Sequence, residues 1–346
     1  MMSQQGAQQK MDEMPPQMIV FQMMSGAWVA QALYVAARLD LAGLLAGGAK
    51  SSEELAAATG THQPTLYRLL RALAGLGLFV EDEGGRFSLA PLGACLQDGP
   101  NSVRAMVLHL GESASWRAWG ELLHSVKTGE TAFKHVHGME VFPFYAQHAE
   151  SNEVFNEAMT NYSEAVSAAV AAAYDFSGAG TIVDIGGGHG SLLTSILKVS
   201  PNSRGILFDL PEAVAEAVER IEGEGLKERC VPVGGDFFES VPEGGDLYIL
   251  KSIIHDWDDS RSLSILRNIH RAMQPDGKLL LVETVIPQGN EPSPAKLGDL
   301  HMLVMTGGCE RTEAEFAALF EASGFKLTGI IPTESMVSIV EGVRVG

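Results

Sequence analysis

The hydrophobic pattern of the chain changes near residue 175, and the change predicts two kinds of structure. Between residues 18 and 45, apolar residues recur every three or four positions, as on one face of a helix. Beyond residue 175, short apolar runs alternate with amphipathic helical stretches, and the last two runs, 326–333 and 336–343, follow each other closely. This alternation predicts an α/β fold with a Rossmann-like doubly wound sheet, and the final pair of runs predicts an antiparallel edge.

The segment between residues 51 and 90 predicts a small domain of two helices and a hairpin. SSEELAAATG places Ser51 and Ser52 ahead of Glu54, as in a capping box, and ends at Gly60. A second short helix follows over 61–77, and two short strands then flank a Gly-Gly turn. This order is typical of a winged helix. Residues 100–175 are expected to be mostly helical.

Charge and composition exclude several classes of function. The chain has 346 residues, of which 46% are apolar, and 43 Asp and Glu against 24 Lys and Arg give a formal net charge of -19. Because nucleic-acid binding depends on neutralising phosphates, and anionic membranes attract basic proteins, we expect neither partner. The second helix of the winged segment carries only Arg68 and Arg71, and its wing is acidic. A packing or dimerisation module therefore fits the segment better than a DNA reader.

The N-terminal part predicts neither export nor membrane insertion. It lacks the basic start and apolar core of a signal peptide, and the chain has no 18-residue apolar run. The cysteines, Cys95, Cys230 and Cys309, form no CxxC pair, which argues against a disulfide framework and a zinc site. We expect a cytoplasmic protein whose first 17 residues are disordered.

The sequence IVDIGGGHG, residues 182–190, predicts a nucleoside-binding turn after a strand. A phosphate-binding P-loop would need GxxxxGK[ST], and a dinucleotide loop would need a glycine at position 191, where the chain has Ser191. Asp184 stands two residues before the first glycine, where it would repel a pyrophosphate but accept a hydrogen bond from an ammonium group. Glycines allow close backbone approach. The turn therefore favours S-adenosylmethionine, a cationic nucleoside with an amino-acid tail.

Polar residues follow the next predicted strands, and the carboxyl ends of parallel strands meet at one edge of a sheet. Asp209 ends the second strand, at the distance from the glycine turn where an acid meets ribose hydroxyls. Asp236 ends the third strand and could bond an adenine amino group, with Phe237 packed on the ring. The fourth and fifth strand ends add further polar groups, namely Lys251, His255, Asp256 and Glu283. Four successive strand ends with acids argue against simple helix capping.

These motifs resemble those of the plant-type O-methyltransferases, the caffeic acid and hydroxyindole group with many bacterial natural-product members. The resemblance extends from about residue 18 to 343 and rests on six motifs together: VDIGGGHGSLL, FDLP, GGDFFESVP, LKSIIHDWDD, LVETVIP and GGCERT. It implies a class I methyltransferase domain over 176–346 and a winged-helix-like dimerisation domain over 18–100. Residues 101–175 would form a helical linker that contributes to the acceptor pocket, and the protein would be a homodimer.

The resemblance also implies roles for individual residues. His255 matches the catalytic base, and Glu283 and Glu310 match the acids that flank it. Apart from the resemblance, the position of Asp256 fits either a cap of the following helix, with Asp258 and Asp259, or a residue that orients the acceptor. The positions that match the cofactor site are Ser163, Asp184, Gly186, Gly187, Gly188, Asp209, Leu210, Gly235, Asp236, Phe237 and Lys251. The positions that match the acceptor pocket are Phe155, Met159, Met302 and Met305.

The chemistry of methyl transfer fits these residues without a metal. A phenol has a pKa of about 10, so a base such as histidine helps at neutral pH, and a carboxylate on its second ring nitrogen would favour the imidazolium that forms. We therefore expect an enzyme that methylates a hydroxyl of a small aromatic or polyketide-like acceptor and releases S-adenosylhomocysteine. Two alternatives are a relative that catalyses decarboxylation or hydroxylation, and a winged-helix regulator that senses the cofactor. We expect no chemical role for His189, and a solvated loop at His135 and His137.

Overall fold

The computed structural model describes residues 14–99 and 102–345, which fall into two compact units, Met1–Ser113 and Ala114–Gly346. Each unit is described by itself. The predicted disordered segment, residues 1–17, lies mostly outside the described residues, and the first helix, α2 (Pro16–Arg38), begins inside it at a proline. The domain boundaries 18–100, 101–175 and 176–346 stay predictions.

The first unit contains the predicted helices and hairpin. Helix α4 (Ser52–Thr59) has the capping box of Ser51 and Glu54 and ends at Gly60 in the left-handed conformation, as the sequence predicts. Helix α5 (Gln63–Gly75) follows, and strands β2 (Phe79–Glu81) and β3 (Arg86–Leu89) pair antiparallel. The remaining elements of this unit are β1 (Lys50–Ser51), which adds to β3, and α3 (Leu41–Leu45), α6 (Pro91–Ala94) and α7 (Arg104–Gly111).

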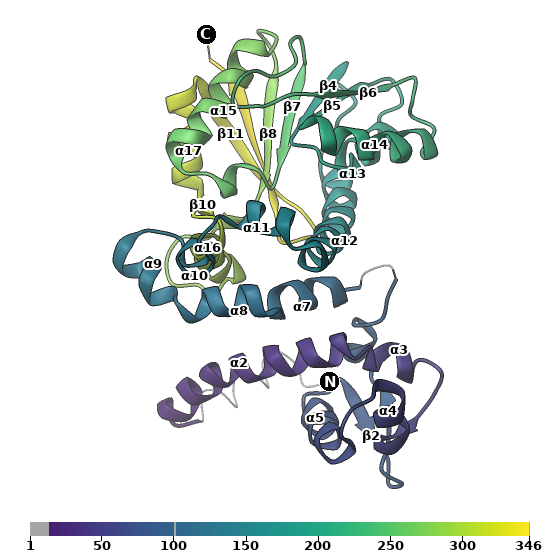
Figure 1. Cartoon of the computed structure of the whole chain (residues 1–346). Helices are drawn as coiled ribbons and strands as arrows, with labels where there is room; N and C mark the ends of the chain where they lie inside the picture. The colour runs from purple at the N-terminus through teal and green to yellow at the C-terminus, as the bar shows by residue number, and fades with distance from the viewer. Residues whose placement is uncertain (1–13, 100–101, 346) are drawn as a thin grey trace. The chain divides into compact units, whose positions relative to one another are not determined.

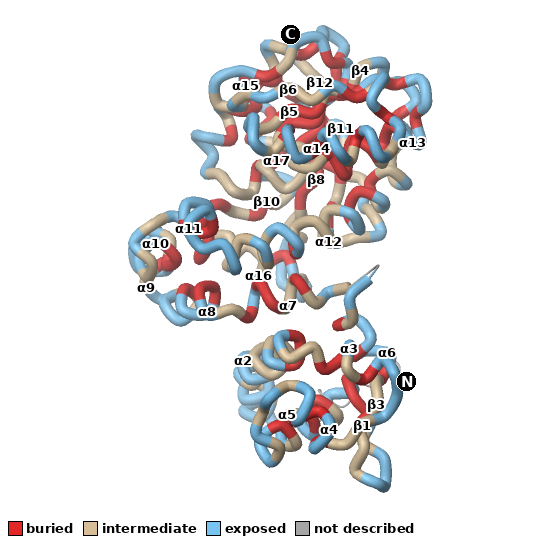
Figure 2. Tube along the Cα trace, turned by 45° about the vertical axis from the view of Figure 1, so that its right-hand side comes forward, coloured by how far each residue is buried: buried red, intermediate tan, exposed pale blue. Residues whose placement is uncertain are grey.

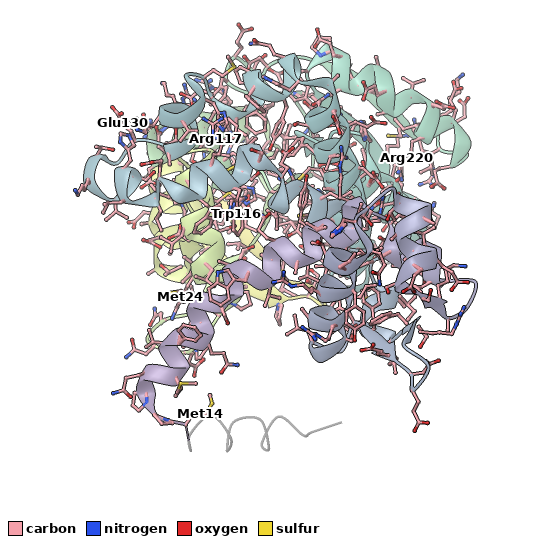
Figure 3. All side chains as sticks on the ribbon, turned by 60° about the horizontal axis from the view of Figure 1, so that its bottom comes forward. Met14, Met24, Trp116, Arg117, Glu130 and Arg220 are labelled. Atoms are coloured by element: carbon pink, nitrogen blue, oxygen red, sulfur yellow. The ribbon has the colours of Figure 1, made fainter. Side chains whose placement is uncertain are left out.

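Helix α2 exposes much of its apolar surface. Figure 3 shows its side chains as sticks, with Met24 labelled. Met23 is 71% and Trp28 is 62% exposed, and Phe21 and Met24 are exposed as well. By length and composition it is the one helix in the described part of the chain that could cross a membrane. The sequence has no 18-residue apolar run, so it did not predict such a helix. An apolar surface of this kind is typical of an interaction site, where another molecule covers it.

The second unit opens with a helical region that leads to the sheet. Its apolar cluster combines buried Phe133, Phe144, Tyr145 and Met305 with half-buried Trp119. The helices of this region are α8 (Ser113–Gly120), α9 (Leu122–Thr128), α10 (Ala132–His137), α11 (Val141–Gln147) and α12 (Ala149–Ala173). The predicted loop at His135 and His137 is wrong, because both residues lie in α10, which Thr131 caps.

A seven-stranded sheet in the order β11-β12-β8-β7-β4-β5-β6 forms the rest of the unit. Strands β4 to β8 are parallel, and β12 pairs antiparallel with both β8 and β11, so the predicted antiparallel edge is confirmed. The seven strands are β4 (Thr181–Ile185), β5 (Arg204–Asp209), β6 (Cys230–Gly234), β7 (Leu247–Lys251), β8 (Lys278–Glu283), β11 (Phe325–Pro332) and β12 (Ser338–Arg344). A parallel pair of β9 (Val285–Ile286) and β10 (Arg311–Thr312) lies beside them.

Helices cover both faces of this sheet, as Figure 1 shows for α13 and α14 on one side and α15 and α17 on the other. Along β7, Leu247 and Ile249 face the cluster that α13 and α14 complete, whereas Tyr248 and Leu250 face the cluster of α15 and α17. The central strands β4, β7 and β8 are accordingly almost wholly buried, whereas the outer strands β6 and β11 are partly exposed; Figure 2 colours the buried residues red. The helices are α13 (Ser191–Val199), α14 (Pro211–Gly223), α15 (Asp259–Ala272), α16 (Pro294–Met305) and α17 (Glu313–Ser323). The doubly wound prediction is confirmed.

Candidate active site

The predicted site residues lie along the carboxyl edge of the parallel strands. The chain runs from β4 outward through β5 to β6, then returns to β7 and β8 on the other side of β4. The order therefore reverses between β4 and β7, which is where doubly wound sheets form a ligand crevice. One half of this edge carries the glycine turn, and the other half carries His255.

The glycine turn brings bare backbone to the end of β4. Gly186 has φ +68° and Gly188 has φ +53°, conformations that other residues rarely adopt. A Cβ at Gly186 would lie 2.5 Å from Cδ1 of Ile253. Gly186 is therefore required by its packing against Ile253, whereas a Cβ at Gly188 would meet no atom within 4 Å, which leaves the backbone there open to a ligand. His189 in the same turn bonds Glu216 at 2.9 Å near the surface.

Asp184 is a fully buried carboxylate at the base of this turn. No hydrogen bond of normal geometry reaches either oxygen from the residues that the structure describes. Burial raises the pKa of Asp184 to about 7, against the opposing charge of Lys251. A buried acid without donors fits a cationic, hydrogen-bond-donating ligand group, such as the ammonium of S-adenosylmethionine.

Asp209 ties strand β5 to the glycine turn. Its Oδ2 accepts a hydrogen bond from the Gly188 amide at 2.8 Å, and its Oδ1 accepts one from the Leu210 amide at 2.7 Å. Each carboxylate oxygen still has a lone pair for a ribose hydroxyl. The side chain of Leu210 is exposed. The sequence identified Asp209 as a ligand contact but did not reveal that it also shapes the turn.

The end of β6 presents the predicted adenine-side residues. A Cβ on Gly235 would lie 2.6 Å from the ring of Phe208, so the glycine permits the close turn. The exposed Asp236 accepts a hydrogen bond from the Phe238 amide at 2.8 Å. Phe237 is half-buried with its ring centroid 4.9 Å from that of Phe238. The three predicted residues therefore lie together.

Lys251 and Ser163 meet although they lie on different elements. Lys251 ends β7, Ser163 lies on α12, and Nζ donates a hydrogen bond to Oγ at 2.8 Å. Burial lowers the pKa of Lys251, while the charges of Asp184 and Glu283 oppose this shift. The pair links the glycine half of the edge to the His255 half.

His255 is held between two buried carboxylates. Its Nδ1 lies 3.0 Å from Oε2 of Glu283 and 3.5 Å from Oε1 of Glu310. Its Nε2 lies 3.9 Å from Oδ1 of Asp256. The structure thus brings together the four residues predicted to be catalytic, with both glutamates near Nδ1 and Asp256 near Nε2.

The acids around His255 dominate its electrostatics. Burial alone would lower the pKa of His255, but the charge of Glu283, the close carboxylate oxygens of Glu283 and Glu310, and the charge of Asp256 raise it well above its usual value. Burial raises the pKa of Asp256 to about 6, against the attraction of His255. The arrangement therefore favours the imidazolium, the form that a base acquires when it takes a proton.

The backbone just before His255 is held by one of these acids, Glu283. Oε1 of Glu283 accepts hydrogen bonds from the amides of Ile253 and Ile254, at 3.1 and 2.8 Å. Just before them, Ser252 adopts φ +55°, which is uncommon outside glycine. Glu283 therefore orients both the imidazole ring and the short turn that presents it.

A second support comes from the GGCERT segment. The Cys309 amide donates to the carbonyl of His255 at 2.9 Å, and a Cβ on Gly308 would overlap that carbonyl. Arg311 is buried, donates to the carbonyls of Ile254 and Trp257, and pairs with Asp259 at 2.8 Å. Sequence reasoning assigned no role to Arg311, although the quoted motif contains it.

The predicted acceptor residues lie on α12 and α16. Met159 and Met302 are half-buried, one on each helix. Phe155 stacks on Tyr145 with centroids 4.6 Å apart, and Met305 is buried in the same apolar cluster. Their contact with an acceptor stays a prediction, which is weakest for Met305 because it already packs in that cluster.

Two side chains near His255 were missed by sequence reasoning. Tyr162 on α12 is half-buried. Burial and the negative charges of Glu283 and Glu310 raise the pKa of its hydroxyl to about 12. His301 on α16 bonds Trp119, and burial and the charge of His255 lower its pKa to about 4. Tyr162 precedes Ser163 and His301 precedes Met302, so adjacency to predicted positions was the available signal.

His255, Glu283 and Glu310 also form the cluster in the described residues that could hold a metal ion, with ligand atoms all within 4.8 Å of one another. A metal ion bound to Nδ1 of His255 would take the place of the proton on that nitrogen, which faces Glu283 and Glu310. The expectation of no metal stays a prediction.

Comparison with known proteins adds to this geometry. Residues 119–326 match the model of the O-methyltransferase domain, and residues 21–99 match that of the O-methyltransferase dimerisation domain. A phenazine O-methyltransferase of Lysobacter antibioticus is 51% identical over 328 residues, 94% of this chain and 96% of that protein. A mitomycin biosynthesis 6-O-methyltransferase of Streptomyces lavendulae is 43% identical over 314 residues, 89% of each chain.

A solved structure shows the likeness in three dimensions. It is an O-methyltransferase from neocarzinostatin biosynthesis in complex with S-adenosylmethionine and 2-hydroxy-5-methyl naphthoic acid. It matches with a TM-score of 0.79 and 33% identity, over 92% of this chain and 96% of that one.

Proposed function

Because the chain belongs to the S-adenosylmethionine-dependent O-methyltransferases of natural-product biosynthesis, we propose that it methylates a hydroxyl of a small aromatic or polyketide-type acceptor, with His255 as the general base. The observation that carries this proposal is the contact of His255 Nδ1 with Glu283 and Glu310, 3.0 and 3.5 Å away. This contact leaves Nε2 to receive a proton. Asp256, 3.9 Å from Nε2, orients the acceptor.

The cofactor site supports the same proposal. Bound S-adenosylmethionine supplies a methyl group on a positively charged sulfur. Asp184 would accept from its ammonium group, Asp209 from its ribose, and Asp236 from its adenine. Lys251 and Ser163, hydrogen-bonded at 2.8 Å, would hold the amino-acid end between the two halves of the site.

The proton path needs only residues of the chain. An acceptor hydroxyl gives its proton to Nε2 of His255 as the oxygen attacks the methyl carbon. Glu283 and Glu310 then face the imidazolium, and their charges stabilise it. Positioning supplies the rest, because attack must be in line with the bond that breaks.

The proposal is tested with the full-length protein. Calorimetry should detect binding of S-adenosylmethionine, and incubation with phenols, flavonoids, quinones and polyketides should yield products that carry an added methyl group by mass spectrometry. An enzyme that binds the cofactor but instead releases carbon dioxide or adds oxygen to its substrate would favour the decarboxylase or hydroxylase alternative. Sequence-specific, salt-sensitive DNA binding in a gel-shift assay would favour the regulator.

We also propose that the first unit forms a homodimer. The match to a dimerisation domain over residues 21–99 and the exposed apolar residues of α2 support this proposal. Light scattering on the eluting protein should give twice the chain mass of 36.9 kDa. Replacing Phe21 and Trp28 with glutamate should shift the protein toward the monomer, and an unchanged dimer mass would contradict an interface on this helix.

A further inference from the structure

Trp119 and His301 form a hydrogen-bonded pair between α8 and α16. Nε1 of Trp119 lies 3.0 Å from Nδ1 of His301, and the two ring planes are 18° apart. An indole nitrogen is only a donor, so Nδ1 of His301 must be the acceptor. A neutral ring that accepts at Nδ1 carries its proton on Nε2. The partner therefore fixes the tautomer of His301.

The surroundings of His301 keep the ring uncharged. Burial and the neighbouring positive charge of His255 lower the pKa of His301 to about 4. A lowered histidine pKa means that the ring is neutral at every pH above that value. At physiological pH the residue therefore differs from a lysine or an imidazolium, because it donates one hydrogen bond without a charge.

The Nε2–H group is open to a ligand. Among the described residues, no protein group forms a hydrogen bond with Nε2 of His301. The atom is also not enclosed by protein, since it is absent from the fully buried polar atoms that have no partner. Helix α16 is tied to the base by contacts: Oδ1 of Asp299, two residues before His301, accepts a hydrogen bond from the Glu310 amide at 3.0 Å, and Oε1 of Glu310 lies 3.5 Å from Nδ1 of His255. Met302, the next residue on α16, is half-buried beside it. A donor without a protein partner, close to the base, points to the bound acceptor as its partner.

We propose that Trp119 positions His301 as a fixed, neutral hydrogen-bond donor to the methyl acceptor, which makes His301 a specificity-determining residue. The site then prefers acceptors that carry an uncharged lone pair, on a ring nitrogen or a carbonyl oxygen, close to the hydroxyl that is methylated. This inference rests on the proposed function. It adds a recognition element that acts on the acceptor skeleton and not on the reacting oxygen.

The tautomer is tested in the protein alone, by nitrogen NMR with ¹⁵N-labelled histidine. The His301 signal, assigned by its loss in His301→Gln, should show a proton on Nε2 and no titration between pH 5.5 and 8, about the range in which an ordinary histidine titrates. In Trp119→Phe the tautomer should become mixed and the ring should begin to titrate at higher pH. A proton on Nδ1 in the wild-type protein would overturn the proposal.

Recognition is tested with two probes of nearly equal shape, 8-hydroxyquinoline and 1-naphthol, which differ in a ring nitrogen next to the hydroxyl. Calorimetry with S-adenosylhomocysteine and EDTA present gives their dissociation constants. Wild type should bind 8-hydroxyquinoline about tenfold more tightly, the worth of one hydrogen bond. His301→Phe should abolish this ratio, and His301→Asn, which keeps a donor, should retain part of it. Trp119→Phe should reduce the ratio without loss of S-adenosylhomocysteine binding.

The outcomes separate this inference from the proposed function. An absence of preference in the wild type, or the same ratio in His301→Phe, overturns the role of His301 even if the enzyme methylates phenols. Loss of S-adenosylmethionine binding in the wild type would instead remove the proposed function, and the NMR result would still decide the tautomer.

Discussion

The two halves of the sheet's carboxyl edge use acidic residues in opposite ways. At the ends of β5 and β6, Asp209 and Asp236 are at least partly exposed, and backbone amides satisfy their carboxylates. In the other half, Glu283 at the end of β8 and Glu310 just before β10 are buried, and they face a single imidazole. The acids at the ends of β5 and β6 are held by backbone hydrogen bonds, whereas the acids around His255 act through charge in a buried environment. Asp184, buried beneath the glycine turn, is the exception in the first half.

This difference predicts how substitutions in each half affect the enzyme. A carboxylate held by backbone amides needs no ionisable partner, so its loss weakens binding without disturbing other charges. A buried acid next to a histidine is part of a coupled set, and removal of one member leaves the others unpaired, which is costly. We therefore expect substitutions in the glycine half to change affinity, and substitutions in the His255 half to change rate and pH dependence.

The largest effect is expected for His255→Gln. Loss of the base should lower kcat by about 10² to 10⁴-fold, the usual contribution of general base catalysis. The dissociation constant for S-adenosylmethionine should stay nearly unchanged. The matched control is His270→Gln, a histidine on α15 that bonds the carbonyl of Val345 and lies outside the site. Full activity of His255→Gln would show that the base is another group.

Asp209→Ala should produce the opposite pattern. It loses one hydrogen bond to the glycine turn, one to the Leu210 amide and one acceptor for the ribose, so we expect affinity for S-adenosylmethionine to fall by about 10 to 100-fold. The kcat at saturating cofactor should change little. Asp276→Ala, which removes an exposed acid in the turn before β8, is the control. An equal loss in kcat would remove the distinction between the halves.

Glu310→Gln should lower kcat by a smaller factor, about tenfold, because Glu283 still holds Nδ1 of His255. The base acts only when Nε2 is unprotonated, and the raised pKa of His255 puts the acid limb of the kcat/KM profile above pH 6.5, the usual histidine value. Removing one negative charge lowers this pKa, so the acid limb should move to lower pH. A limb that stays in place would mean that His255 does not set it.

The smallest effect is expected for chelation. If the cluster of His255, Glu283 and Glu310 holds a proton and no metal, dialysis against EDTA should leave kcat and the cofactor dissociation constant unchanged. Loss of activity that a divalent cation restores would show a metal at this cluster. In that case, His255, Glu283 and Glu310 would be metal ligands, and the two glutamates would not serve to stabilise an imidazolium.

The sequence predicted much of the sheet and its edge. Apolar runs that end in Asp184, Asp209, Lys251 and Glu283 are local patterns, and parallel strands bring such ends together whatever the details of packing. The capping box at Ser51 and the antiparallel final strands are local signals of the same kind.

Other features of the site depend on contacts that no local pattern encodes. Trp119 and His301 are 182 positions apart, and their hydrogen bond depends on how α8 packs beside α16. Glu283 reaches back 29 and 30 positions to the amides of Ile254 and Ile253. In the stretch KHVHG, His135 and His137 resemble a metal pair without a third ligand and were therefore predicted to lie in a solvated loop, but Thr131 caps this stretch as a helix.

The double attachment of Glu283 limits how this enzyme can diversify. One oxygen fixes the turn of Ile253 and Ile254, and the other contacts the imidazole, so a substitution there alters loop shape and proton affinity in one step. New acceptor preferences are therefore expected to arise by mutation of the predicted acceptor residues on α12 and α16, Phe155, Met159, Met302 and Met305, which carry no ionisable group. An engineer who wishes to redirect the enzyme should keep β8 constant and randomise the two helices.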